Sequence, residues 1–516
     1  MPTSEAKFDS LLPYLLKDSE VVKSLLSDGY AVIPDVLSEE ECEEGLEVMW
    51  EYLSTVGRNV DRNDPTSWYP RPHRTWGTME DPWPQTYEKS FPDMQQNCGA
   101  GWMFGRVREL VAKRVFEDRI FGTDQLLCSK EGFTARRPLS VTITRSDEEE
   151  KEKMKKRRQR KKKQSSSENQ SERTTVLLHP RQNHDVNVCG KPQKFSIGEH
   201  YDQSASDSGI NYIQSSVSFV DQDSEGKDGC FVCWPKSFSK VHQAIVQQTY
   251  RGTKSECWVP LTDEELYRLR DEYGLERKLV PVRKGSVIVW RSDLVHAAAG
   301  PMMKLYDKVN DEILKSGIRQ SNNFRMVAYM SMIPARCALN EKYDSLRKQK
   351  IEAYLTSRTG DHRPDIECWH SDWGQGQKLD QKSEKDGRVR LVKTYQQLSQ
   401  QLPKLTIRQA ELYGLIPYEE CNNSEDKFET LRHLIDLGVK FSSDVIGCED
   451  LKGKIHPSLR ELRHKSGEDM LGQGMSTIIC LLSKIIIYFV HFYFDSIQTN
   501  GSVVSFSSQQ NLIIIR

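Results

Sequence analysis

The chain has 516 residues, with 73 Lys and Arg against 74 Asp and Glu and a formal net charge of -1 at pH 7. This balance gives no overall case for a nucleic acid or a membrane surface as a partner, because either one favours an excess of positive charge. Hydrophobic residues make up 37% and charged residues 28% of the chain, which predicts a sizeable folded core together with segments that do not fold.

The N-terminal elements predicted first lie between residues 20 and 53. Residues 20–28 predict a helix, and the apolar run 30–33 predicts a strand. Ser38 with Glu41 three residues later forms a capping box, which marks the start of another helix. Apolar residues at three- and four-residue spacing give that helix one face for a core: Leu46, Met49, Trp50 and Leu53.

Residues 54–100 are rich in Pro, Trp, Arg and Asp and read as long loops, and a further helix is expected over 107–121. Residues 145–188 read as a charged insertion without structure, because a run such as the basic stretch 151–163 cannot bury apolar surface. Two interpretations of that stretch stay open: a nuclear-localisation or polyanion-binding patch, and a solvated loop between two strands.

From residue 195 to 334 the pattern changes to short apolar runs divided by Gly, Asp and Ser. Strands are expected at 217–220, 231–234, 287–290 and 326–332, a spacing typical of a β-sandwich or barrel. Helices return at 342–355 and 406–412, with a polar loop over 356–390 between them. Cys230 and Cys233 form a close pair without a second pair to complete a zinc site, so we expect free, buried packing cysteines in a reducing compartment.

The C-terminal segment 476–494 is almost continuously apolar and about long enough to cross a bilayer. Lys484 and His491 interrupt it, and a lysine near mid-span costs roughly 2.5–3.5 kcal/mol on insertion scales. Three interpretations stay open: a tail anchor, a buried helix or strand, and a C-terminus that results from an incorrect gene prediction. The N-terminus shows no secretory pattern, so we expect a cytoplasmic protein, with a nuclear location or tail-anchored membrane association as the alternatives.

The residues that indicate chemistry begin with His200 and Asp202. Side chains at i and i+2 of a strand point the same way, so these two project together while Tyr201 faces away. His296 follows a second apolar strand and is the candidate for a third ligand. Two His and one carboxylate form a facial triad that leaves open metal positions. His242 also follows a turn, but His296 is preferred because Arg325 comes after it at the start of another strand.

These motifs together resemble the phytanoyl-CoA dioxygenase family of Fe(II)/2-oxoglutarate-dependent oxygenases. The resemblance covers about residues 25–340: the opening at 30–38, the His-Tyr-Asp-Gln motif at 200–203, the segment 228–237 with its glycine turn, the run 285–296 and Arg325. It implies a mainly β double-stranded β-helix (a cupin-like jelly roll) with flanking helices, and a helical C-terminal extension over 341–470. Residues 1–24 are then a lead-in, and 471–516 an apolar tail.

The resemblance also implies the site and the reaction. His200, Asp202 and His296 would hold Fe(II), and Arg325 would bind the far carboxylate of the cosubstrate 2-oxoglutarate. With O2, such enzymes convert 2-oxoglutarate to succinate and CO2 and hydroxylate a small-molecule or acyl substrate. The alternative is a non-catalytic member that serves as a binding or scaffold protein. The sequence leaves the substrate and the oligomeric state open, and nucleic acid is not an expected partner.

Weaker candidates surround these residues. Trp290 and Trp234 are either pocket-lining side chains or ordinary core. Gln203 and Asn211 either orient the ligands through hydrogen bonds or form surface hydrogen bonds of no consequence to the site.

Overall fold

The computed structural model describes residues 11–72, 79–84, 93–96, 99–138, 140–145, 173–178, 197–299, 323–338, 343–365, 402–418 and 424–442, with short gaps at 205–206, 208, 225, 227, 250–257, 356, 358 and 361. The chain divides into two compact units at residues 445 and 446, and the second unit lies outside the described residues. The predicted apolar segment 476–494 belongs to that second unit. The basic stretch 151–163 belongs to the first unit and also lies outside the described residues. Across the described part, no helix has the length and apolar character needed to cross a membrane.

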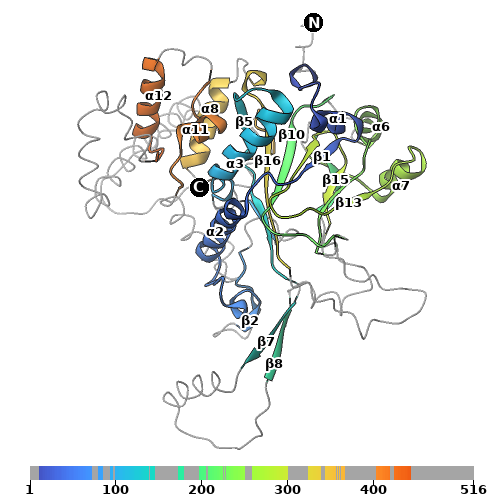
Figure 1. The fold of residues 1–516 in the computed structure, drawn as a ribbon, viewed down its shortest axis with the longest axis vertical. Helices are drawn as coiled ribbons and strands as arrows, with labels where there is room; N and C mark the ends of the chain where they lie inside the picture. The colour runs from blue at the N-terminus through green and yellow to red at the C-terminus, as the bar shows by residue number, and fades with distance from the viewer. Residues whose placement is uncertain are drawn as a thin grey trace, which may run out of the picture. The chain divides into compact units, whose positions relative to one another are not determined.

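The larger of the two main sheets has seven strands, all paired antiparallel (Figure 1). Its order is β1-β14-β10-β16-β6-β4, with β5 pairing to another part of β16. The strands are β1 (Tyr30–Ile33), β4 (Met94–Gln95), β5 (Leu126–Cys128), β6 (Phe133–Arg136), β10 (Ile213–Ser218), β14 (Val287–Arg291) and β16 (Arg325–Pro334).

The smaller sheet has five antiparallel strands in the order β12-β9-β15-β11-β13. It places His200 directly opposite His296 on neighbouring strands. Gly229, with φ of +83°, makes the turn before β11, a conformation that side chains with a Cβ rarely adopt. The strands are β9 (Ile197–Tyr201), β11 (Phe231–Cys233), β12 (Val259–Pro260), β13 (Lys278–Val280) and β15 (His296–Ala298).

N-terminal helices cover the outer face of the larger sheet. The predicted capping box is confirmed, because Ser38 accepts from the Glu41 N–H while the Glu41 carboxylate accepts from the Ser38 N–H. Gly45 lets this helix approach Phe219, whose ring would overlap any Cβ at that position. These helices are α1 (Glu20–Ser27), α2 (Glu39–Val56), α3 (Gly105–Val111) and its π-helical continuation η4 (Ala112–Phe121).

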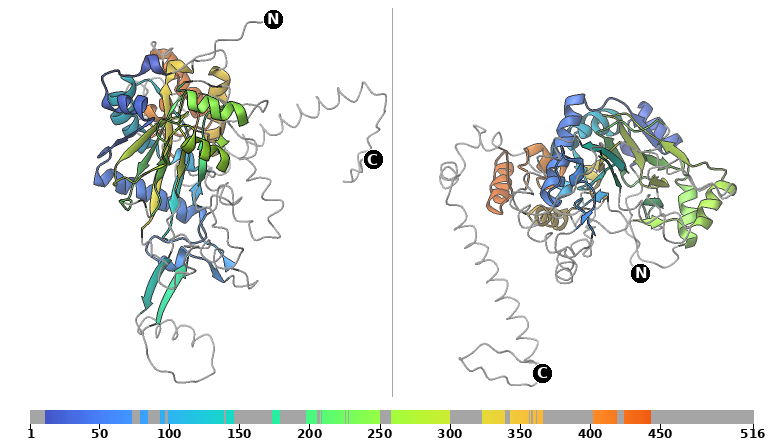
Figure 2. Two further views of the ribbon diagram at one scale, coloured as in Figure 1. Left: turned by 90° about the vertical axis from the view of Figure 1, so that its right-hand side faces the viewer. Right: turned by 90° about the horizontal axis from the view of Figure 1, so that it is seen from below.

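Two further helices, α6 (Lys240–Thr249) and α7 (Asp263–Asp271), pack on the outer face of the smaller sheet. Ile245, Val246 and Leu269 meet Tyr201 and Val295 there. Seen from below in Figure 2, the blue N-terminal helices and the green α6 and α7 lie on opposite sides of the strands.

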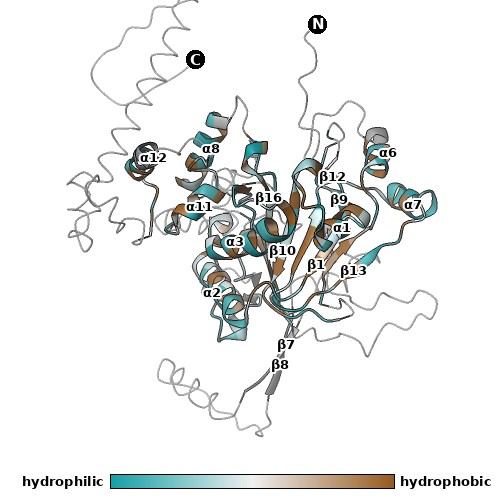
Figure 3. Cartoon of the chain, turned by 45° about the horizontal axis from the view of Figure 1, so that its top comes forward, coloured by the Kyte–Doolittle hydropathy of each residue, from teal (hydrophilic) through white to brown (hydrophobic). Residues whose placement is uncertain are grey.

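The inner faces of the two sheets also pack against each other through apolar side chains. Tyr30, Ile288 and Trp290 from the larger sheet contact Phe231 and Cys233 from the smaller one. In Figure 3 the strands are largely brown, whereas the helices turn teal faces outward. Two antiparallel sheets face each other with helices outside them, so the predicted double-stranded β-helix with flanking helices is confirmed.

The C-terminal helices α8 (Tyr343–Leu355) and α11 (Ile407–Leu412) agree with the predicted ranges 342–355 and 406–412, and α12 (Ser424–Asp436) adds a third. Helix α11 contacts α3 and β5. The remaining short elements are η1 (Leu12–Tyr14), η2 (Pro65–Ser67), β2 (Arg71–Pro72), β3 (Met79–Glu80), η3 (Ala100–Trp102) and η5 (Ala335–Cys337).

Two sequence predictions differ from the structure. Strand β10 runs over Ile213–Ser218 rather than 217–220. Within the insertion predicted to lack structure, Arg173–Leu178 forms strand β8, which pairs with β7 (Ser140–Arg145). The run Arg-Thr-Thr-Val-Leu-Leu is rich in β-branched and apolar side chains, which favour a strand despite the charged residues before it.

Candidate metal centre

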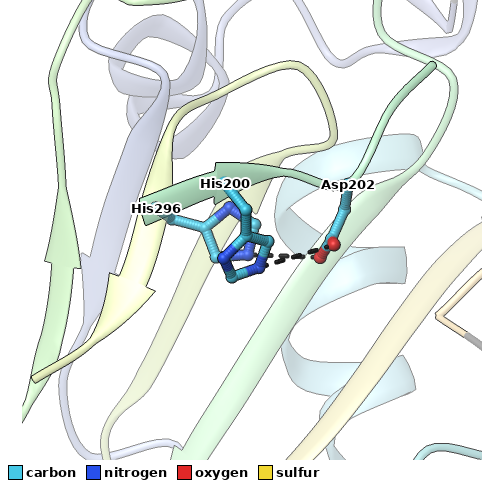
Figure 4. Close-up of side chains that lie close together, drawn as sticks. All are labelled: His200, Asp202 and His296. Carbon is cyan, nitrogen blue, oxygen red and sulfur yellow. Dashed lines mark ion pairs between the residues drawn. The ribbon is translucent and has the colours of Figure 1, made fainter. Parts of the chain in front are cut away.

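The three predicted ligands lie together at the inner face of the smaller sheet. His200 comes from β9, Asp202 follows the end of β9, and His296 begins β15 (Figure 4). Nε2 of His200 lies 3.5 Å from Asp202 Oδ1, and Nε2 of His296 lies 3.2 Å from Asp202 Oδ2. One ligand atom from each residue lies within 4.8 Å of the others, and all three residues are buried. Among the described residues this is the one His, Cys, Asp and Glu group with such spacing.

Backbone carbonyls orient both imidazoles. Nδ1 of His200 lies 2.7 Å from the Gly198 carbonyl oxygen, and Nδ1 of His296 lies 3.0 Å from the Leu294 carbonyl oxygen. A carbonyl oxygen only accepts, so each Nδ1 carries the proton and donates it. The lone pair of each Nε2 then points toward Asp202, which is the tautomer that a metal ligand needs.

Asp202 is fixed by two residues that the sequence analysis did not single out. Gln214 Nε2 donates to Asp202 Oδ2 at 2.6 Å, and the Tyr212 hydroxyl donates to the Asp202 carbonyl oxygen. Gln203 and Asn211, which were considered for this role, instead contact Ser292. Gln214 lies in the part of β10 that the predicted strand left out, so its orientation could not be inferred from the sequence.

The electrostatics of the site favour a negatively charged Asp202. Burial alone would raise the pKa of Asp202, but three surrounding imidazoles, with His362 the largest contributor, outweigh it and hold the pKa well below its ordinary value. Burial, followed by the repulsion of nearby His296, lowers the pKa of His200 to about 4. One carboxylate and two neutral imidazole nitrogens form a donor set that suits a divalent transition metal.

The depressed pKa of His200 predicts how the metal-free protein responds to acid. The unfolded chain takes up a proton near the ordinary pKa of 6.5, whereas the folded chain does so only near 4. The free energy of unfolding should therefore fall as the pH drops from 6.5 to 4, by up to about 3 kcal/mol from this residue.

Urea denaturation of the metal-free protein at several pH values measures this effect. In His200→Ala the free energy of unfolding should depend less steeply on pH in the same window, because the contribution of His200 is lost. Other buried groups, such as His242, keep their contributions. An identical slope in the two proteins would contradict the depressed pKa.

Arg325 lies on the inner face of the larger sheet, at the start of β16. Its Nη1 donates to the Tyr329 hydroxyl at 3.2 Å, while its buried Nε has no hydrogen-bond partner. Within the described part of the chain it forms no ion pair with a carboxylate. Arg136 lies opposite it in register and is also buried. Burial, and then the charge of Arg325, lowers the pKa of Arg136 to about 10, so two buried arginines lie side by side at this end of the larger sheet's inner face.

The weaker candidates fall on both sides of the smaller sheet. The Trp290 ring lies 5.3 Å from the His296 ring and lines the site. Trp234 and His242 lie on the outer face instead, and His242 Nε2 contacts the Gln203 carbonyl oxygen at 3.1 Å. Cys230 and Cys233 are buried and free, as predicted.

Several solved structures are similar to this chain at low sequence identity. SnoK, a non-heme alpha-ketoglutarate-dependent carbocyclase from nogalamycin biosynthesis, is 15% identical over 61% of this chain and 83% of its own, with a TM-score of 0.27. HygX from Streptomyces hygroscopicus, with nickel and 2-oxoglutarate bound, is 15% identical over 62% and 87%, with a TM-score of 0.27. EctD from S. alaskensis, with bound Fe, is 12% identical over 62% and 80%, also at 0.27.

No family model and no curated protein matches the sequence. Similarity to the solved structures at this level concerns the fold alone, so we base the function on this chain's own side chains.

Proposed function

We propose that this chain is a non-haem Fe(II)- and 2-oxoglutarate-dependent dioxygenase of the phytanoyl-CoA dioxygenase type, which hydroxylates a small molecule. The observation that carries the proposal is the buried group of His200, Asp202 and His296, with both Nε2 atoms directed at one carboxylate. The sequence resemblance led to the same three residues from their motifs, and the fold brings them together from strands far apart in the chain.

The three side chains would hold Fe(II) on one face, which leaves the opposite coordination positions open. When bound, Fe(II) supplies the oxidative chemistry, in which O2 and 2-oxoglutarate yield succinate, CO2 and a hydroxylated substrate carbon. The carbonyls of Gly198 and Leu294 keep the imidazoles in the required tautomer. Asp202 fills the position that a halide would need, so hydroxylation or demethylation is favoured over halogenation.

Arg325 would bind the far carboxylate of 2-oxoglutarate. A guanidinium can donate two parallel hydrogen bonds to a carboxylate, and the Arg325 Nε is buried without a partner. Arg136 adds a second positive charge at the same end, which an incoming anion would stabilise. The Tyr329 hydroxyl between Thr134 and Arg325 keeps the guanidinium in place.

Anaerobic titration of the full-length protein with Fe(II) and 2-oxoglutarate tests this function. We expect a weak visible charge-transfer band when both are present, followed by slow succinate release in air without any added substrate. A well-folded, iron-supplied protein that gives neither the band nor succinate would instead favour the non-catalytic scaffold that the sequence left as the alternative.

A further inference from the structure

The described residues that follow α8 (357, 359–360 and 362–365) are held by hydrogen bonds and ion pairs to neighbouring loops and to α8 itself. Arg363 pairs with Asp207 at 3.1 Å and with Asp365 at 2.8 Å. Because Asp207 follows Asp202 in the loop before β10, this ion pair ties the segment to the loop that carries a proposed ligand. Further hydrogen bonds hold it along its length: Gly99 N–H to the Ser357 carbonyl, Gly360 N–H to the Lys130 carbonyl, and Lys350 Nζ to the Pro364 carbonyl.

His362 is the side chain that this segment delivers to the site. Its Nδ1 lies 4.0 Å from Asp202 Oδ1, and its ring lies 5.6 Å from the Tyr212 ring at an interplanar angle of 31°. It is not one of the three residues whose ligand atoms lie close together. His362 therefore stands beside the metal centre rather than within it. No motif in the sequence pointed to this residue.

Glu131 is a second buried group beside the centre. It is 8% exposed, and the hydroxyls of Ser129 and Ser331 both donate to its Oε1 at 2.7 Å. In the described part of the chain, no hydrogen bond to Oε2 accompanies these two. Burial raises the pKa of Glu131 against the opposing effect of nearby His362, while the charge of Asp202 raises it further. Glu131 Oε2 can therefore accept a hydrogen bond from a bound molecule.

Gln214 offers a second acceptor. Its Nε2 donates to Asp202 Oδ2, and since a carboxylate only accepts, this bond fixes which end of the amide faces Asp202. Its Oε1 is buried without a hydrogen-bond partner. Gln214 lies directly opposite Ser331 in the β10–β16 register, so this oxygen lies on the same side of the site as Glu131.

Strand β16 sets the order of the polar side chains that face the site. Arg325, Tyr329 and Ser331 are spaced by even numbers of residues, so they share the inner face, and a strand rises ~3.3 Å per residue. Arg325 and Ser331 are therefore roughly 20 Å apart along the strand. If 2-oxoglutarate extends from the metal to Arg325, as proposed above, the space toward Ser331 is left for the substrate.

On that basis, which rests on the proposed function, we infer that the substrate is a polar molecule whose hydroxyl or amine groups donate hydrogen bonds to Glu131 and Gln214, with His362 contacting it from the C-terminal extension. An acyl chain would leave these acceptors without donors, which would weaken its binding. The extension thus shapes substrate selection. Polyols, amino sugars and diamines all carry such donors.

Thermal unfolding of the full-length protein loaded with Ni(II), which does not turn over, and 2-oxoglutarate tests the inference. The donor-bearing probes are myo-inositol, D-glucosamine and 1,3-diaminopropane, and the acyl probe is the N-acetylcysteamine thioester of octanoic acid. We expect at least one donor-bearing probe to raise the Tm by about 2 °C or more, and the thioester to leave it unchanged. Glu131→Gln and His362→Ala should each weaken that probe's affinity about 10-fold or more.

Glu265→Gln is the matched control, because Glu265 is a buried carboxylate in the capping box of α7, on the outer side of the smaller sheet. The inference is overturned if the thioester alone stabilises the protein, if no donor-bearing probe does so, or if both variants keep the wild-type affinity. Two variants guard against one that does not fold. A Tm that 2-oxoglutarate itself fails to raise in the Ni(II) protein would count against the proposed function instead, so the two failures are distinguishable.

Discussion

His200→Ala is expected to abolish Fe(II) binding and succinate release in the full-length protein. The substitution removes one of three ligands from a buried site, where breaking a matched set of charged and polar partners costs about 3–5 kcal/mol. That cost corresponds to a loss of roughly 10²- to 10⁴-fold in metal affinity. Isothermal titration with Fe(II) under anaerobic conditions measures the affinity, and succinate release in air measures the activity.

His242→Ala provides a matched control, because His242 lies on α6 and packs against the opposite face of the strand that carries His200. His242 is as buried as His200, but it contacts the outward-facing Tyr201 and the Gln203 carbonyl oxygen. Its loss should reduce the free energy of unfolding by about 2–5 kcal/mol, as other large-to-small core substitutions do, and leave the Fe(II) affinity unchanged. Equal loss of metal affinity in both variants would show a folding defect rather than a metal ligand.

The parts of the fold that could be predicted from the sequence each depend on a pattern within a few neighbouring residues. The strand at Tyr30–Ile33 and the helix after Ser38 depend on an apolar run and on a capping box, both complete within a few residues. The proximity of His200 and Asp202 likewise follows from strand geometry alone. His296 and Arg325 came from the order of motifs in the resemblance, because no local pattern shows which strands become neighbours.

Strand β10 shows why the bounds of a strand that faces a polar site are hard to predict from hydropathy. Ile213 and Val217 belong to the apolar cluster on the helix side of the larger sheet, whereas Gln214 faces the site. Ser215 on the helix side satisfies its hydroxyl through the Met330 carbonyl. A strand with polar side chains on its pocket face has too few apolar residues to be recognised by hydropathy, so the predicted strand began four residues late.

Glu131 and His362 could not have been found from the sequence for a different reason. Both depend on pairings between residues far apart in the chain, such as Gly360 N–H with the Lys130 carbonyl. The region 356–390 reads as a polar loop, and nothing in its composition shows that His362 lies beside Asp202, about 160 residues earlier in the chain. Such contacts are set by tertiary packing and not by local propensity.

Arg325→Lys and Arg325→Ala are expected to raise the KM for 2-oxoglutarate by roughly 30-fold to several thousand-fold, with alanine the larger effect. Removing one partner of a buried, hydrogen-bonded charge pair costs about 2–5 kcal/mol. Lysine keeps the charge but cannot form two parallel hydrogen bonds to a carboxylate. Because Arg136 remains at the same end of the pocket, some affinity should survive even in the alanine variant. Succinate release at increasing 2-oxoglutarate concentrations measures the effect.

Arg137→Lys separates this role from a general need for buried arginine. Arg137 is also buried, but its guanidinium forms two hydrogen bonds with Asp81 away from the site. Its replacement should lower the free energy of unfolding and leave the KM for 2-oxoglutarate unchanged. Arg325→Lys should instead raise the KM and leave the free energy of unfolding nearly unchanged. If both variants raise the KM equally, Arg325 does not bind the cosubstrate directly, and the two-cation end of the pocket would have to serve another anion.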